Sequence, residues 1–208
     1  MSLARLLQLA SPTLPVGAYS YSQGLEAAIE AGVVSDAASA QRWIADVLAF
    51  SIATMDAPLL FILLNDESRQ EELNLLYLAS RESAELRAET LQMGYSLCRL
   101  LTELGVQGLP EGDVAYPVAF ACAARSWAIE PRAALEAYLW SWLESQVMAA
   151  VKAVPLGQTA GQKILLELGE IISAASHSLH SEEMSNFAPG LAVMSARHET
   201  QYSRLFRS

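Results

Sequence analysis

Residues 131–147 read PRAALEAYLWSWLESQV, and they form the clearest helix pattern in the chain. Pro131 suits the first turn of a helix, where its missing N–H would have no partner in any case. The pattern ends near Pro155, because proline cannot continue a helix. Apolar side chains recur every three or four positions and share one face; they are Leu135, Tyr138, Leu139, Trp142, Leu143 and Val147. Other helices have to cover a face this apolar.

In almost every other segment of the sequence, apolar residues also recur at the intervals typical of a helix. Ser35 and Asp36 can begin a helix, Pro58 is expected to kink or restart one, and residues 65–68 and 108–113 are expected to be loops. The predicted helices cover about 24–31, 36–50, 59–64, 71–80, 91–104, 117–127, 131–154 and 159–179. The alternating patterns of strands are absent. The sequence therefore predicts one all-α domain over residues 1–208, a single-domain helical bundle of roughly seven to nine helices.

The composition excludes several classes of protein. The 208 residues are 52% hydrophobic and 17% charged, which excludes disorder over most of the chain. With 13 basic and 23 acidic residues the net charge is −10, and Lys and Arg do not cluster, so we expect neither nucleic acid nor membrane as a partner. The apolar runs 58–64 and 115–124 are too short to span a bilayer. Cys98 and Cys122 are expected to be free thiols in a soluble cytoplasmic protein.

No segment carries a recognisable catalytic or cofactor motif. Residues 157–163, GQTAGQK, resemble a phosphate-binding loop, but three residues separate the glycines where the Walker motif has four. His177 and His180 are three residues apart and could bind a metal on one helix face, although a solvated surface pair is the simpler interpretation. No nucleophile lies in a catalytic pattern. We therefore predict no catalytic residue, no metal ligand and no cofactor.

The opening segment is stiffer than a simple connection requires. Residues 11–20 read SPTLPVGAYS, in which two prolines and a glycine restrict the backbone and fix the positions of Tyr19 and Ser20. A simple loop that enters the helix at Gly24, capped by Ser20 or Ser22, is an equally good interpretation. The pattern alone leaves both interpretations open.

The last residues differ from an ordinary frayed terminus. Residues 197–208 read RHETQYSRLFRS, so that arginines alternate with Tyr202, Leu205 and Phe206. Arginine and aromatic side chains are enriched at the centres of protein interfaces. The segment is expected to dock on a partner, and docking on its own domain is the alternative.

Five blocks of sequence, in order, resemble the UreF family of urease accessory proteins. The blocks are LLQLASP at 6–12 with LPVG at 14–17, SYSQGLE at 20–26, ELRAETLQMG at 85–94, PLGQ at 155–158 and HETQYSRLFRS at 198–208. Together they extend over nearly the whole chain. One departure is Ala18-Tyr19, where many members of the family have Gly-Phe; the tyrosine keeps the aromatic ring and adds a hydroxyl.

The resemblance implies an all-α, non-catalytic cytoplasmic protein that acts in nickel delivery to urease. Proteins of this family form homodimers, bind the accessory protein UreD, called UreH in some organisms, and then recruit the GTPase UreG. The assembly engages the urease apoprotein, so that GTP hydrolysis is coupled to nickel insertion into the active site. The alternative is a metallochaperone that binds nickel directly through His177 and His180, or through His198.

The resemblance also implies which residues contact partners. Tyr19 is expected to contact Arg204, and Lys152 with the turn at 155–158 is expected to face UreG. Glu26 and His198 are expected to support the loop and the tail. The expected interaction segments are the N-terminal loop 1–23 and the C-terminal tail 185–208. The predicted partner-binding residues are Tyr19, Ser20, Glu26, Lys152, Pro155, Leu156, Gly157, Gln158, Arg197, His198, Glu199, Tyr202, Arg204 and Phe206.

Overall fold

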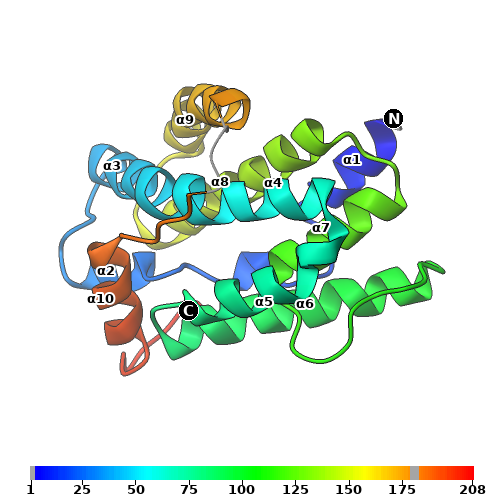
Figure 1. Cartoon of the computed structure of the whole chain (residues 1–208). Coiled ribbons are helices and arrows are strands. Elements are labelled where there is room, and N and C mark those ends of the chain that lie inside the picture. The colour runs from blue at the N-terminus through cyan, green and yellow to red at the C-terminus, as the bar shows by residue number, and fades with distance from the viewer. Residues whose placement is uncertain (1–2, 179–182) are drawn as a thin grey trace.

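A computed structural model describes residues 3–178 and 183–208, and within these ranges every regular element is helical (Figure 1). This confirms the predicted all-α bundle. The α-helices are α1 (Leu3–Leu9), α2 (Leu25–Glu30), α3 (Ala37–Val47), α4 (Ala57–Asn65), α5 (Gln70–Ala79), α6 (Ala84–Glu103), α7 (Tyr116–Ser126), α8 (Pro131–Ala153), α9 (Gln158–Ser178) and α10 (Pro189–His198).

Helix α8 lies at the centre of the bundle, as its apolar face requires. It packs against α9 and α4, and its residues Leu135, Leu139 and Leu143 are fully buried. Each such side chain contributes roughly 1.5–3 kcal/mol by leaving water. Helices α9 and α6 lie at opposite faces of the molecule, with α3 and α4 between them (Figure 1). The predicted helix thus forms the core on which the other elements pack.

The path from α3 to α4 is one helical run in which Leu48–Asp56 form a π-helix. Pro58, where we expected the helix to kink or restart, lies in the first turn of α4, and the helical run continues through it as the π-helix gives way to an α-helix. Because proline has no N–H, Pro58 cannot donate a hydrogen bond to the preceding turn of the helix. The backbone N–H of Ser185 donates to Thr54 O at 2.9 Å, and that of Phe187 donates to Phe50 O at 3.1 Å. The segment that leads into α10 therefore stabilises the widened helix.

The same helical run, Ala37–Asn65, is long and apolar enough to cross a membrane by length and composition alone. However, 67% of its most apolar window is buried inside the molecule. Leu59, Leu60 and Leu63 are fully buried, and α4 packs against α7 and α8. Such burial is typical of the core helix of a soluble domain.

Three local features differ from the sequence-based expectations. Helices α1 and α10, at the two ends of the chain, were not among the predicted helices. The residue that precedes α2 is Gly24, with φ of 77°, although the hydroxyl of the predicted cap Ser22 accepts a hydrogen bond from Glu26 N in the first turn of α2 at 3.3 Å. A side chain at Gly24 would meet Ser195 N of α10 at 2.9 Å, so glycine also permits the close packing of α2 on α10.

Candidate functional site

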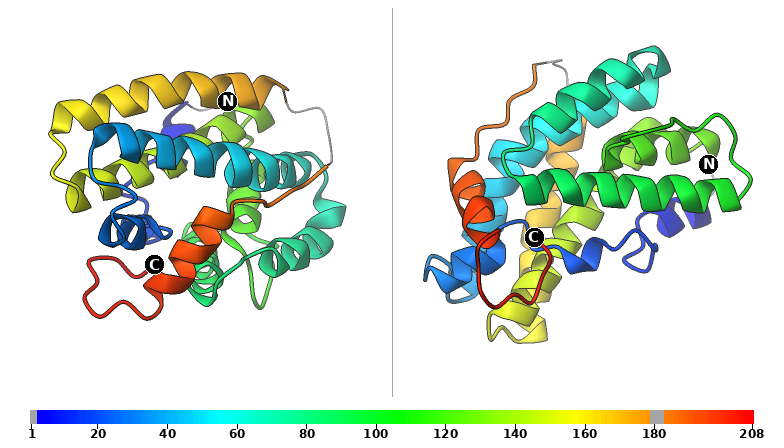
Figure 2. Two further views of the ribbon diagram at one scale, coloured as in Figure 1. Left: turned by 90° about the vertical axis from the view of Figure 1, so that its left-hand side faces the viewer. Right: turned by 90° about the horizontal axis from the view of Figure 1, so that it is seen from below.

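The last residues of the chain lie beside the segment that leads into α2 (Figure 2). We call residues 199–208, which follow α10, the terminal loop. The Ser22 hydroxyl donates to the carbonyl oxygen of Ser208 at 2.6 Å, and the backbone N–H of Gln23 donates to the same oxygen at 3.1 Å. The N–H of Arg207 donates to Ser20 O at 2.8 Å. Hydrogen bonds thus join residues 20–23 to residues 207–208, which lie near the opposite end of the sequence.

Glu26 in the first turn of α2 holds the middle of the terminal loop. Its Oε1 accepts a hydrogen bond from Leu205 N at 2.6 Å, and its Oε2 accepts one from Phe206 N at 2.9 Å. Backbone N–H groups bound to a carboxylate form the stronger, charge-assisted kind of hydrogen bond. The Phe206 side chain is buried. Glu26 therefore binds two successive backbone N–H groups of the terminal loop.

His198, the last residue of α10, lies between two carboxylates and is fully buried. Its Nδ1 is 2.7 Å from Glu85 Oε2, and its Nε2 is 3.2 Å from Glu26 Oε2. The other oxygen of Glu85 pairs with Arg204 Nη1 at 2.6 Å. Next along the chain, Glu199 Oε1 accepts from Ala84 N at 2.8 Å and so caps α6. His198 thus connects α10, α2 and α6 at the base of the terminal loop.

Glu89, one turn further along α6, contacts the end of the terminal loop from inside the molecule. Its Oε2 accepts from the Ser208 hydroxyl at 2.7 Å, and its Oε1 accepts from Gln23 Nε2 at 2.7 Å. Trp142 Nε1 donates to Gln23 Oε1 at 2.8 Å, which fixes the orientation of that amide. Burial raises the pKa of the Glu89 carboxyl to about 7, although the hydrogen bonds from Gln23 and Ser208 act in the opposite direction.

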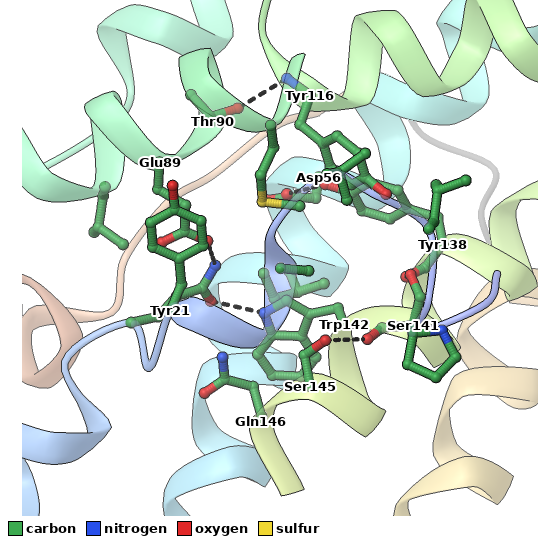
Figure 3. Close-up of a pocket in the computed structure, with 18 of the residues that line it drawn as sticks. Tyr21, Asp56, Glu89, Thr90, Tyr116, Tyr138, Ser141, Trp142, Ser145 and Gln146 are labelled. Atoms are coloured by element: carbon green, nitrogen blue, oxygen red, sulfur yellow. Dashed lines mark hydrogen bonds between the residues drawn. The ribbon is translucent and has the colours of Figure 1, made fainter. Parts of the chain in front are cut away.

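Glu89 also lines a partly open cavity of about 70 Å³ (Figure 3). Across it, Asp56 Oδ1 accepts from the hydroxyls of Tyr77, at 2.6 Å, and Tyr138, at 2.9 Å. Burial raises the pKa of both tyrosines well above its ordinary value, so both remain neutral donors. Arg81 Nη2 lies 3.9 Å from Asp56 Oδ2. The cavity is much smaller than pockets that bind drug-sized ligands, so we place the candidate site at the surface.

The surface beside the terminal loop is rich in exposed aromatic and basic side chains. Tyr19 and Tyr202 are both exposed, and the Arg204 side chain is partly so. Lys152 Nζ, near the end of α8, lies 5.9 Å from the ring centres of Tyr19 and Phe206. At this separation a lysine ammonium is attracted to the ring faces. The opening segment, the terminal loop and the end of α8 therefore form one continuous surface.

The structure separates the predicted partner-binding residues into two groups. His198, Phe206 and most of Glu26 are enclosed by the chain itself, where they position the terminal loop. The second group is at least partly exposed; it contains Tyr19, Ser20, Lys152, Pro155, Leu156, Gly157, Gln158, Arg197, Glu199, Tyr202 and Arg204. One expected contact is corrected: Arg204, which we expected to meet Tyr19, forms its ion pair with Glu85. The carboxylate offers a far stronger electrostatic partner than a ring hydroxyl.

Sequence reasoning missed several residues that hold the terminal loop. They are Ser22, Gln23, Glu85, Glu89 and Ser208. The signal was the spacing of Glu85 and Glu89, which puts two acidic side chains four positions apart on one face of α6, beside apolar positions. Buried acids almost always have partners, so this face pointed to a polar contact inside the molecule.

The alternative histidine pair cannot be placed. His180 lies outside the residues that the structure describes, and so does the side chain of His177. Within the described residues, no group of three or more His, Cys, Asp or Glu side chains is arranged to hold a metal ion. Cys98 and Cys122 are free thiols, as expected.

Comparison with known proteins identifies the family. A model of the UreF family matches residues 34–169. The chain is 56% identical to the urease accessory protein UreF of Azoarcus sp. (strain BH72), with 100% of this chain and 96% of the relative covered. It is 54% identical to the same accessory protein of Dechloromonas aromatica (strain RCB) and 50% identical to that of Methylobacillus flagellatus, with 100% of this chain and 98% of each relative covered. Because the likeness extends from end to end, this chain belongs to the UreF family of urease accessory proteins.

Proposed function

We propose that this protein is a non-catalytic scaffold of urease maturation. Together with UreD, or UreH, it recruits the GTPase UreG to the urease apoprotein. GTP hydrolysis by UreG is coupled there to nickel insertion into the urease active site. The protein acts in the cytoplasm as a homodimer. Membership of the UreF family supports an accessory role, and the surface around the terminal loop supports a role in assembly.

The observation that carries the proposal is the outer surface of the terminal loop. Tyr202 is fully exposed and Leu205 is 63% exposed, although hydrogen bonds to Glu26 hold the loop backbone in place. An ordered loop that presents a tyrosine ring and Arg204 to water offers two of the side-chain types that are enriched at interface hot spots, and Leu205 adds exposed apolar surface beside them. We assign this face to UreD.

A second, adjacent face suits UreG. Lys152 and the turn Pro155–Gln158, between α8 and α9, lie at the surface. The cation–π contacts of Lys152 with Tyr19 and Phe206 join this face to the terminal loop. UreD on the first face would then complete the surface that UreG meets on the second, which accounts for recruitment in that order.

The test is co-expression with tagged UreD and with UreG, followed by pull-down and sizing by light scattering. The test variant is Tyr202→Ser with Leu205→Ser, because both side chains are exposed and their loss leaves the core intact. We expect recovery with UreD to fall about tenfold or more, the effect of removing one hot spot. The wild-type complex is expected to contain two copies of this chain.

The matched control is Tyr95→Ser with Leu75→Ser. These residues are 63% and 62% exposed and lie on α6 and α5, so the same change is made at similar exposure outside the terminal loop. The control is expected to assemble like the wild type. If the Tyr202/Leu205 variant also assembles like the wild type while UreD and UreG are folded, the assignment of the UreD face is wrong. Loss of assembly in both variants would contradict it equally.

A further inference from the structure

The cavity beside Glu89 contains more hydrogen-bonding groups than the surrounding side chains satisfy. Asp56 and Arg81 both line it, and their side chains are only 2% and 7% exposed. Asp56 Oδ1 accepts from two tyrosine hydroxyls, whereas Asp56 Oδ2 and Arg81 Nε are buried without a hydrogen-bond partner among the described residues. Arg81 Nη2 lies 3.9 Å from Asp56 Oδ2, which is too long for a direct hydrogen bond. One acceptor and one donor are therefore unsatisfied on this side of the cavity.

Gln146 on α8 adds an amide group to the same cavity (Figure 3). It is only 3% exposed, and its side chain forms no hydrogen bond with any residue that the structure describes. An amide has two N–H donors and one carbonyl acceptor. The neighbouring indole N–H of Trp142 already donates to Gln23, so it is not available to Gln146. Because buried polar groups in native proteins have partners in the protein or in ordered water, Gln146 needs a ligand in the cavity.

The charges and the size of the cavity restrict the nature of this ligand. Asp56 and Arg81 carry opposite charges that balance, and both oxygens of Glu89 already accept hydrogen bonds. The cavity therefore favours a neutral ligand. Its volume of about 70 Å³ is that of about two water molecules, since one water occupies about 30 Å³ in the liquid. Water both donates and accepts, which matches the unsatisfied groups of Asp56, Arg81 and Gln146.

We propose that this cavity is a hydration site, which binds about two ordered water molecules as structural ligands. The waters donate to Asp56 Oδ2 and to the carbonyl of Gln146, and they accept from Arg81 Nε and from the Gln146 amide. Several residues of the range 12–18 in the opening segment also line the cavity. The bound waters therefore lie between this segment and the bundle, where they fill polar space that no side chain fills. The hydration site is a property of the isolated chain and does not depend on the proposed function.

The test combines a high-resolution crystal structure of the full chain with an NMR measurement in solution. We expect electron density for ordered water within about 3.2 Å of Asp56 Oδ2, Arg81 Nε and the Gln146 amide. In solution, the side-chain amide protons of Gln146 are expected to show NOEs to water with the sign of water that tumbles with the protein. Density for a larger organic molecule, a cavity closed by direct contact between Asp56 and Arg81, or the absence of these NOEs would overturn the proposal.

Gln146→Met distinguishes a water bound by specific groups from solvent that merely occupies space. Methionine has an unbranched side chain of the same length but lacks the amide donors and acceptor, so the variant is expected to lose the water at residue 146 and to keep the one at Asp56.

The matched control is Gln92→Met, the same change at an exposed position of α6 outside this cavity, and it is expected to keep both waters. A Gln146→Met structure that retains both waters, or a Gln92→Met structure that loses either, would contradict the proposal. If the Gln146→Met protein does not fold, the wild-type structure and its NMR spectrum decide alone. None of these measurements involves UreD, so the hydration site can fail while the scaffold function stands.

Discussion

Glu89 combines complete burial with a carboxyl group that ionises near neutral pH. Burial raises its pKa from an ordinary value near 4.5 to about 7. Between these two values the unfolded chain is ionised while the folded chain keeps its proton. The folded state therefore binds more protons, and the free energy of unfolding falls as the pH rises from about 4.5 to about 7. Above about pH 7 the ionisation of Glu89 lowers the free energy of unfolding no further, and its total effect is a decrease of roughly 2–4 kcal/mol.

Glu89→Gln is expected to remove this contribution. Glutamine can accept from Gln23 and donate to the Ser208 hydroxyl, so both hydrogen bonds of the site have a counterpart without a buried charge. At pH 8 we expect the variant to be more stable than the wild type by about 1–3 kcal/mol, with a smaller difference at pH 5. Urea denaturation at the two pH values measures this. Glu103→Gln, at an exposed position of the same helix, should change neither value by more than about 0.5 kcal/mol.

At single positions, the sequence predicted residues whose chemistry is visible locally. Glu26 and His198 lay in blocks shared with a known family, and the structure places them in contact with each other, with Glu26 also bound to the terminal loop. The partner of Arg204 was predicted wrongly, because the choice between Tyr19 and Glu85 depends on how α6 and α10 pack together. That packing joins residues more than a hundred positions apart, and no local pattern encodes it.

At the level of elements, prolines and long periodic runs were the reliable signals. Pro131 begins α8 and Pro58 lies in the first turn of α4, as predicted. The π-helix before Pro58 was not predicted, and two of its carbonyl oxygens accept hydrogen bonds from Ser185 and Phe187, which lie more than a hundred positions away in the sequence. Helix α10 is short and has two small residues in its first turns, which hide its period.

Helix α6 passes so close to the segment before α7 that only glycine fits at position 94. A Cβ atom on Gly94 would lie 2.0 Å from the carbonyl oxygen of Val114, which is a backbone atom and cannot move by itself. Gly94→Ala is therefore expected to destabilise the protein by about 3 kcal/mol or more, despite the higher helix propensity of alanine. Thermal unfolding followed by circular dichroism measures the loss.

Gly190→Ala is the matched comparison, because it makes the same change in another helix. A Cβ atom there would lie 3.8 Å from the ring of Trp43, an ordinary contact. We expect it to be neutral or to stabilise the protein by up to about 1 kcal/mol. Equal melting temperatures for the two variants would show that α6 does not approach Val114 this closely in solution.

At the scale of the whole molecule, the docked terminal loop contributes to the stability of the fold. Deleting residues 202–208 removes the buried Phe206 side chain and frees the polar groups of Ser22 and Glu26 to water. Since water then solvates these groups, the main loss is the burial of Phe206, and we expect the free energy of unfolding to fall by about 2–3 kcal/mol. Chemical denaturation of the purified chain measures it. An unchanged midpoint would mean that the loop is not docked in solution.

The fold class and the presence of two special terminal segments could be predicted from the sequence, because helix period and residue chemistry are local. The meeting of these segments could not be predicted from the residues alone. Ser22 and Ser208, which join them, are small polar residues of kinds that occur throughout the surface of any protein. Only their position opposite each other in the folded chain makes them significant.

The contact between Ser22 and Ser208 spans 186 positions, and this has a consequence for biosynthesis. Domains begin to fold while the ribosome adds roughly 5–20 residues per second. Residues 20–26 are therefore synthesised roughly ten to forty seconds before the residues that complete their hydrogen bonds. During that interval α2 lacks the hydrogen bonds that Leu205 and Phe206 donate to Glu26, so this edge of the bundle stays open until the terminal loop has been made.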